Sequence, residues 1–146
     1  MSTPASASFR SRTYDEISVG DEIEPFELAL TPQRMVMDCG VNRDFAPIHH
    51  DGEIARALGA PDMFVNTLFL QGVYESAVRE WAGLDARVLK IRFRMKTFNC
   101  AGDMLVCTGR VVEKNVDDDG QSVVTLDVQT DTQRGTTTNG QVVISV

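Results

Sequence analysis

The strongest constraint on the fold is a change of hydrophobic periodicity at Gly83. Over Val65–Ala82, apolar residues recur at helical spacing, and the first half of this stretch is apolar around most of its circumference. Over Leu89–Lys96, apolar and charged residues alternate strictly, which is typical of a half-buried strand. Further strands are expected over residues 103–115, 121–133 and 136–146. One long helix followed by antiparallel strands predicts an α+β domain in which the helix packs against a sheet.

The first third of the chain is expected to contain a strand and two shorter helices. The strand covers about residues 23–30, and Thr31-Pro32 follows it. This pair is a helix start, because threonine is a good N-cap and proline is tolerated at the first helical position. We expect the helix to end near Gly40. After a loop, Asp51 is placed to cap a short helix that runs through Leu58.

Composition predicts one compact domain. The chain has 146 residues, of which 42% are hydrophobic and 24% charged, as in globular proteins with a real core. We expect residues 1–12 to form a flexible tail and residues 13–146 to form the domain. No apolar run approaches the length of a membrane span, and the first dozen residues lack the apolar stretch of a signal peptide. No membrane partner is therefore expected.

Net charge and cysteine content limit the classes of protein to which the chain could belong. The formal net charge of -7 argues against general nucleic-acid binding, which depends on a basic surface. The three cysteines are an odd number without metal-ligand spacing. Reduced thiols, a cytoplasmic location and no metal site are therefore expected.

Candidate chemistry is concentrated in the loop that contains both histidines of the chain. Asp44 lies five residues before His49, and Pro47 between them stiffens the backbone. A carboxylate held near an imidazole can activate water, because one group accepts a proton while the other orients the water or returns a proton. On spacing alone, such a pair more often only ties a loop down or caps a helix.

The segment from Asp44 to Asp51, with the sequence DFAPIHHD, resembles the hydratase motif of the MaoC-like family. This family comprises the (R)-specific 2-enoyl-CoA hydratases, and its motif usually reads Asp-Phe-Asn-Pro-x-His-x-Asp. Three further segments resemble family landmarks in the right order, so that the resemblance covers about residues 14–146: residues 14–21, Gly102-Asp103 and residues 132–135. It implies a hotdog fold, in which a curved antiparallel sheet wraps around one long helix, usually in dimers.

The resemblance also implies the reaction. Asp44 and His49 would hold the water that adds to a trans-2-enoyl-CoA, giving an (R)-3-hydroxyacyl-CoA, or would catalyse the reverse dehydration. Asp44 would be the principal base, with His49 polarising the water and helping to deliver a proton to the α-carbon. No cofactor is expected beyond the coenzyme A of the substrate.

The family stabilises the thioester oxygen with the backbone N–H of a glycine that follows a histidine at the start of the central helix. Val65 and Asn66 occupy these two positions here, so the His-Gly pair is absent. A backbone donor survives replacement of its side chain, and we expect the Asn66 N–H to serve as the oxyanion donor. Ala46 replaces the asparagine of the motif, and Phe98 stands where many members have proline.

A basic strip on the alternating strand is a candidate for binding coenzyme A. It contains Lys90, Arg92, Arg94 and Lys96. Lys96 is the best single candidate for the phosphates, followed by Arg94, and Val65 is expected to contact the substrate. The alternative is a solvated outer face whose charges pair with acids on a neighbouring strand.

A narrower resemblance connects the chain with the small catalytic subunit of actinobacterial steroid side-chain enoyl-CoA hydratases. It rests on residues 43–45, 49–51, 64–66 and 81–83. This resemblance implies a bulky, polycyclic acyl-CoA and a heteromer with a larger hotdog subunit, where the wider family implies a homodimer. A hotdog thioesterase and a non-catalytic subunit that supports a partner hydratase are the alternative functions.

Overall fold

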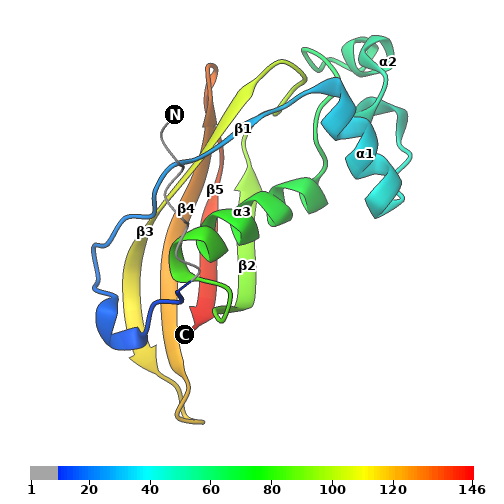
Figure 1. Cartoon of the computed structure of the whole chain (residues 1–146). Helices are drawn as coiled ribbons and strands as arrows, with labels where there is room; N and C mark the ends of the chain where they lie inside the picture. The colour runs from blue at the N-terminus through cyan, green and yellow to red at the C-terminus, as the bar shows by residue number, and fades with distance from the viewer. Residues whose placement is uncertain (1–9) are drawn as a thin grey trace, which may run out of the picture.

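The long helix α3, Thr67–Ala82, lies across one face of a five-stranded antiparallel sheet (Figure 1). The computed structural model describes residues 10–146. The strands follow the order β1-β3-β4-β5-β2. Their bounds are β1 Phe26–Ala29, β2 Arg87–Met95, β3 Met104–Val116, β4 Ser122–Thr132 and β5 Gly135–Ser145. The predicted α+β class, with one long helix against an antiparallel sheet, is confirmed.

Two shorter helices lie together beyond one end of the sheet, beside the start of α3 (Figure 1). They are α1, Pro32–Asn42, and α2, Gly52–Ala57. Short 3-10 turns precede β1 at Tyr14–Glu16 and interrupt the loop between α1 and α2 at Pro47–His49.

The buried face of α3 and the inner face of the sheet form one hydrophobic core. Leu70 and Tyr74 of α3 belong to the same cluster as Leu126 and Ile144 of the central strands, and all four are 0% exposed. Full burial of a leucine-sized side chain contributes about 1.5–3 kcal/mol. The core therefore holds the N-terminal end of α3 in a fixed place relative to the sheet.

The backbones of β2 and β5 approach each other closely at Gly140. Gly140 pairs with Phe93, and a Cβ atom at Gly140 would collide with the carbonyl oxygen of Arg92. Only glycine allows two backbones to approach this closely. Register shifts at β-bulges, one of them between Val88 and Lys90, add twist to the sheet. The curved sheet predicted for a hotdog domain follows from these features.

The helix ends agree with the predicted capping residues, with one correction. The Thr31 hydroxyl accepts a hydrogen bond from the Arg34 backbone N–H at 3.2 Å, as the predicted helix start requires. The predicted end of this helix near Gly40 is wrong, because α1 continues to Asn42. Arg43 then ends it by adopting the left-handed conformation, with φ at 55°.

The predicted N-terminal tail, residues 1–12, falls mainly outside the described residues. Its described end is attached to the end of α3. The backbone N–H of Arg12 donates to the Ala82 carbonyl oxygen at 2.8 Å, and its guanidinium lies 5.0 Å from the centre of the Trp81 ring. The Ser11 hydroxyl accepts from the Asp85 N–H at 3.0 Å. The contacts of the domain therefore begin before the predicted boundary at residue 13.

A buried carboxylate joins two turns that lie far apart in the sequence. Asp103 has a side chain that is 0% exposed. It accepts hydrogen bonds from the Cys100 N–H at 2.8 Å, Gln133 Nε2 at 2.6 Å and Arg134 Nη1 at 2.7 Å. Two of the family landmarks, Gly102-Asp103 and residues 132–135, are thus bonded to each other.

The structure also bears on the expectations about membrane-spanning segments and cysteines. No helix within residues 10–146 combines the length and the apolar character needed to cross a membrane. Cys39, Cys100 and Cys107 are free and buried, and burial raises the pKa of Cys107 to about 12.

Candidate active site

The predicted catalytic pair lies on the loop between α1 and α2, against the N-terminal end of α3 (Figure 1). Asp44 follows the left-handed Arg43, and its N–H donates to the Cys39 carbonyl oxygen at 3.1 Å. His49 ends the 3-10 turn that begins at Pro47, as expected for a backbone stiffened by proline. The end of α1 and this turn bring the two side chains together.

The Asp44 and His49 side chains face each other. His49 Nε2 lies 3.4 Å from Asp44 Oδ2, and His49 Nδ1 lies 2.7 Å from the Phe64 carbonyl oxygen. A carbonyl can only accept, so Nδ1 carries the proton in the neutral ring and Nε2 is left as an acceptor. Two acceptors at this separation can both receive hydrogen bonds from one water molecule.

The two members of the pair differ in exposure. The His49 side chain is 10% exposed, with its edge against the Phe64 ring, whereas the Asp44 side chain is 34% exposed. Asp44 therefore offers its carboxylate to a reactant while the imidazole is held from behind. This division of roles suits Asp44 as the principal base.

The pKa of Asp44 is lowered from its usual value. The largest cause is a hydrogen bond from the Asn66 side chain, with smaller contributions from the Ala46 N–H and from His49, while burial works in the opposite direction. The carboxylate is therefore ionised at neutral pH and able to accept a proton.

Asn66 connects the base to the long helix. Its Oδ1 caps α3 by accepting from the Phe69 N–H at 2.9 Å, and its Nδ2 donates to Asp44 Oδ2 at 3.0 Å. Within residues 10–146, no backbone hydrogen bond uses the Asn66 N–H, the donor expected to bind the oxyanion. Sequence reasoning assigned only this N–H and missed the side chain.

A second carboxylate near the pair was also missed. Asp38 lies one turn before the end of α1 and accepts a hydrogen bond from Asn42 Nδ2 at 2.5 Å. Burial is the largest cause raising the pKa of Asp38, the nearby charge of Asp44 raises it further, and His49 lowers it when the imidazole is protonated. No sequence pattern indicated that this helical residue faces the loop.

The remaining polar residues of the loop have local roles. His50 is exposed, and its ring nitrogen lies 3.3 Å from the Phe45 carbonyl oxygen. Asp51 caps α2, as predicted, by accepting from the backbone N–H groups of Glu53 and Ile54. Within the described range 10–146, no group of three or more His, Cys, Asp or Glu residues is placed to hold a metal ion.

Comparison with known proteins identifies the family. The chain matches no protein-family model. It is 33% identical over 97 residues to the 3-oxo-4,17-pregnadiene-20-carboxyl-CoA hydratase beta subunit of Mycobacterium tuberculosis, a match that covers 66% of this chain and 75% of that protein. The chain belongs to the MaoC-like hydratase family. The enzyme class predicted from the loop motif, an enoyl-CoA hydratase, is thereby confirmed.

Solved structures support the same assignment. A chain of the ChsH1-ChsH2 complex from Mycobacterium tuberculosis superposes with a TM-score of 0.81 at 29% identity, covering 88% of this chain and 98% of that one. An (R)-hydratase from A. caviae involved in PHA biosynthesis gives a TM-score of 0.79 at 18% identity, covering 89% and 97%. The second match shows the fold alone. The predicted hotdog fold is confirmed.

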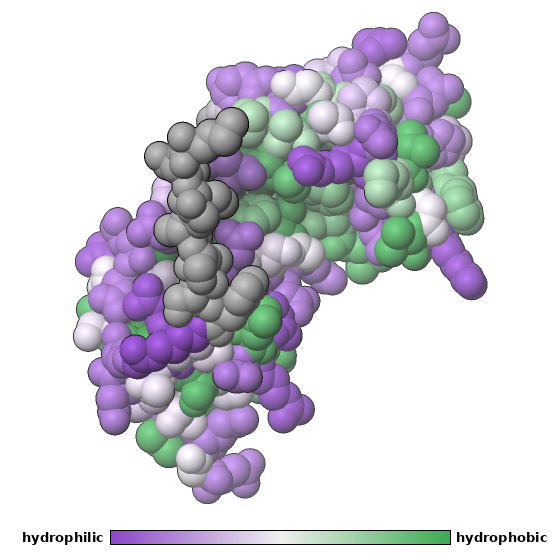
Figure 2. Space-filling view, viewed as in Figure 1, coloured by the Kyte–Doolittle hydropathy of each residue, from purple (hydrophilic) through white to green (hydrophobic). Residues whose placement is uncertain are grey.

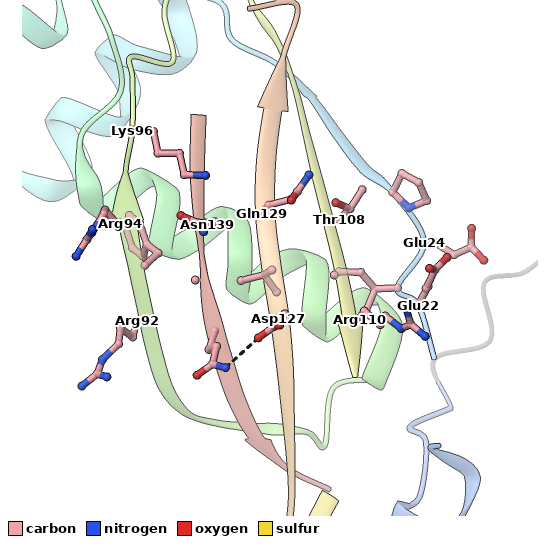
Figure 3. Close-up of a pocket in the computed structure, with 17 residues that line it drawn as sticks. Glu22, Glu24, Arg92, Arg94, Lys96, Thr108, Arg110, Asp127, Gln129 and Asn139 are labelled. Carbon is pink, nitrogen blue, oxygen red and sulfur yellow. Dashed lines mark hydrogen bonds between the residues drawn. The ribbon is translucent and has the colours of Figure 1, made fainter. Parts of the chain in front are cut away.

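In this MaoC-like hydratase, three members of the basic strip, Arg92, Arg94 and Lys96, lie on the face of the sheet turned away from α3 (Figure 3), whereas Lys90 lines a second groove beside the start of α3. Phe93 and Met95 pack toward the core, so Arg92 and Arg94 point to the opposite face. Together with Lys96 they line a groove of about 1120 Å³ whose other side carries Glu22, Glu24 and Arg110. The structure does not bring Arg94 or Lys96 into contact with the catalytic pair.

Val65, which is expected to contact the substrate, belongs to the buried core at the start of α3. Its side chain is 2% exposed within the core, and its N–H donates to the Asn99 carbonyl oxygen at 3.0 Å. This bond connects the start of α3 to the segment that follows β2. Lys96 lies three residues before Asn99, so it is the member of the strip nearest along the chain to the segment bonded to the start of α3.

The elements that carry the pair also present apolar side chains to solvent. Figure 2 shows apolar surface around the hollow between the helical end of the molecule and the sheet. The large apolar residues exposed by 47–83% on α1, the catalytic loop and the first turn of α3 are Val36, Met37, Val41, Phe45 and Leu68. Apolar surface of this extent beside a polar site is typical of a binding or interaction surface.

Proposed function

We propose that this MaoC-like hydratase adds water to a trans-2-enoyl-CoA with a bulky, polycyclic acyl group, and that it acts together with a second hotdog subunit. The observation that carries the proposal is the juxtaposition of Asp44 Oδ2, His49 Nε2 and Asn66 at the start of α3. The Asp44 carboxylate is a proton acceptor that is open to the reactant. His49 is a second acceptor, and the ring nitrogen on its far side is bonded to the backbone. Unpaired backbone N–H donors at the start of α3 lie beside both residues.

The proposed chemistry needs two proton transfers, one new carbon–oxygen bond and one new carbon–hydrogen bond. Water accepted between Asp44 and His49 loses a proton to Asp44 as its oxygen attacks the β-carbon. Asp44 then returns this proton to the α-carbon, with His49 helping to deliver it, so the carboxylate is regenerated and the net change is the addition of one water molecule. Negative charge that develops on the thioester oxygen is stabilised by the Asn66 N–H and by the positive end of the helix dipole.

The substrate class rests on the relative and on the apolar surface. The relative at 33% identity is named for a steroid acyl-CoA, 3-oxo-4,17-pregnadiene-20-carboxyl-CoA. Exposed Val41 and Phe45 flank Asp44 along the chain, and Leu68 follows Asn66 by two residues. Apolar side chains on both sides of a polar reacting centre suit a large ring system better than a short acyl chain.

A second subunit is supported by an open edge of the sheet. Among residues 10–146, β2 pairs with β5 on one side only, and an open groove of about 520 Å³ lies between this edge and the start of α3. Thr67 and Gln71 line it from the helix. A partner strand on β2 would close the groove, and unpaired strand edges are rarely left uncovered. The relative is itself named a beta subunit, and the similar structure is a complex.

Loss of the ultraviolet absorbance of a 2-enoyl-CoA tests this function. The chain would be assayed alone and after mixing with the other chain of the ChsH1-ChsH2 complex, on a four-carbon 2-enoyl-CoA and on 3-oxo-4,17-pregnadiene-20-carboxyl-CoA. Faster turnover of the steroid substrate only in the mixture supports both halves of the proposal. Turnover by the chain alone contradicts the need for a second subunit. Preference for the four-carbon substrate contradicts the substrate class.

The role of Lys96 can be tested with the same assay. We expect Lys96→Ala to raise KM about 3-fold and to leave kcat nearly unchanged, because a phosphate contact remote from the reacting atoms contributes equally to the ground and transition states. Arg92→Ala is the matched control, since Arg92 lies on β2, which ends just before Lys96, and lines the same groove. An unchanged KM in Lys96→Ala would assign the whole strip to the solvated outer face.

A further inference from the structure

We propose that the Asn66 side chain is a positioning residue for the base: it aims the Asp44 carboxylate and couples it to the first turn of α3. This inference rests on the proposed role of Asp44 as base. It concerns the side chain alone and is separate from the expected role of the Asn66 backbone N–H.

The direction of the Asn66 amide is determined by its two partners. The Phe69 N–H can only donate, so the amide oxygen must face the helix, where it accepts at 2.9 Å. The amide nitrogen must then face Asp44 Oδ2, to which it donates at 3.0 Å. Asn66 is 5% exposed, so water competes little with either bond. One side chain thus caps a helix and donates to the base at the same time.

The contact acts on the oxygen that faces His49. Asp44 Oδ2 receives the Asn66 donor and also lies 3.4 Å from His49 Nε2, whereas Oδ1 receives only the long bond from the Ala46 N–H at 3.4 Å. Loss of the Asn66 donor would leave the carboxylate free to rotate on a loop. The long helix α3, which packs into the hydrophobic core, therefore keeps the Asp44 carboxylate of the loop in one orientation.

The same contact determines the protonation of the base. A donor to the charged form of a carboxylate favours that form, and Asn66 is the largest cause of the lowered pKa of Asp44. Because a base must be unprotonated, a lower pKa extends activity toward acid. The usual glycine at this position of the family has no side chain and cannot supply this support.

Two variants separate this role from helix capping. Asn66→Ser retains an oxygen that can cap α3 but has no donor of the right reach, and Asn66→Asp retains the cap and the shape but replaces the donor by a negative charge. The pKa of Asp44 would be measured from the pH dependence of its side-chain carboxyl ¹³C resonance. We expect an increase of about one unit in Asn66→Ser and a larger increase in Asn66→Asp.

The kinetic profile should change in the same direction. We expect kcat to fall about tenfold in Asn66→Ser with KM nearly unchanged, and the acid limb of the pH profile of kcat to move to higher pH. Thr31→Ala is the control, because it removes the cap of α1 without touching Asp44. Its Asp44 titration should match the wild type.

An Asp44 titration that is the same in the wild type and both Asn66 variants overturns the proposal. The resonance does not depend on turnover. A shift of the titration in a protein that hydrates no enoyl-CoA would therefore retain the Asn66 contact and reject the proposed function instead.

Discussion

Asp44→Asn is expected to lower kcat for hydration by about 10²–10⁴-fold, the range that a positioned general base contributes. The amide keeps the shape of the carboxylate but cannot accept the proton of water. KM should change little, because the substituted group acts on water and not on the acyl-CoA. The measurement is the initial rate of loss of enoyl-CoA absorbance, in whichever assembly gives the wild-type protein its activity.

His49→Ala is expected to cause a loss in the same range, since it removes the second acceptor for the water. Two matched controls lie in the same loop. His50→Ala removes an exposed imidazole, and Asp51→Asn neutralises a carboxylate that asparagine can replace as a helix cap. Both controls should retain nearly wild-type kcat.

The double variant provides a further check. If Asp44 and His49 act on one water molecule, the combined substitution should lower kcat little more than either alone, because residues that act as a unit are not additive. Wild-type rates in both single variants would remove this loop from the mechanism. Equal losses in the controls would mean that any change in the loop disrupts the site.

The elements of the fold were predictable because their signals are local. The alternation over Leu89–Lys96 and the Thr31 cap lie within a few residues of the structure they specify. The order of the strands and the curvature of the sheet were not predictable in this way. The approach of Gly140 to Arg92, for example, is a contact between strands far apart in the sequence.

In the site, as in the fold, the features with local sequence signals were predictable and the long-range contacts were not. The motif identified Asp44 and His49, and the structure brings them together. An asparagine before a helical run is a capping signal, so the Oδ1 bond of Asn66 could have been inferred. Its bond to Asp44, 22 residues away, could not, because it depends on how the loop docks against α3.

The Asp103 turn shows how a long-range contact can be tested through stability. Arg134→Met is expected to lower the free energy of unfolding by about 3 kcal/mol, near the lower end for breaking a buried ion pair. The carboxylate is 0% exposed and would lose the cation that pairs with it, while the bonds from Cys100 and Gln133 remain. The urea midpoint should fall by about 1–2 M at a fixed protein concentration.

A surface pair of the same chemistry provides the control. Arg56 and Asp62 lie 3.1 Å apart with side chains that are 51% and 38% exposed, so Arg56→Met should cost about 0–1 kcal/mol. Both substitutions remove one arginine and retain a long side chain, so the difference between them isolates the burial of Asp103. Equal midpoints would show that the remaining donors alone satisfy that carboxylate. The bond between the two turns would then stabilise the fold through Gln133 and the backbone, and the charge of Arg134 would be dispensable.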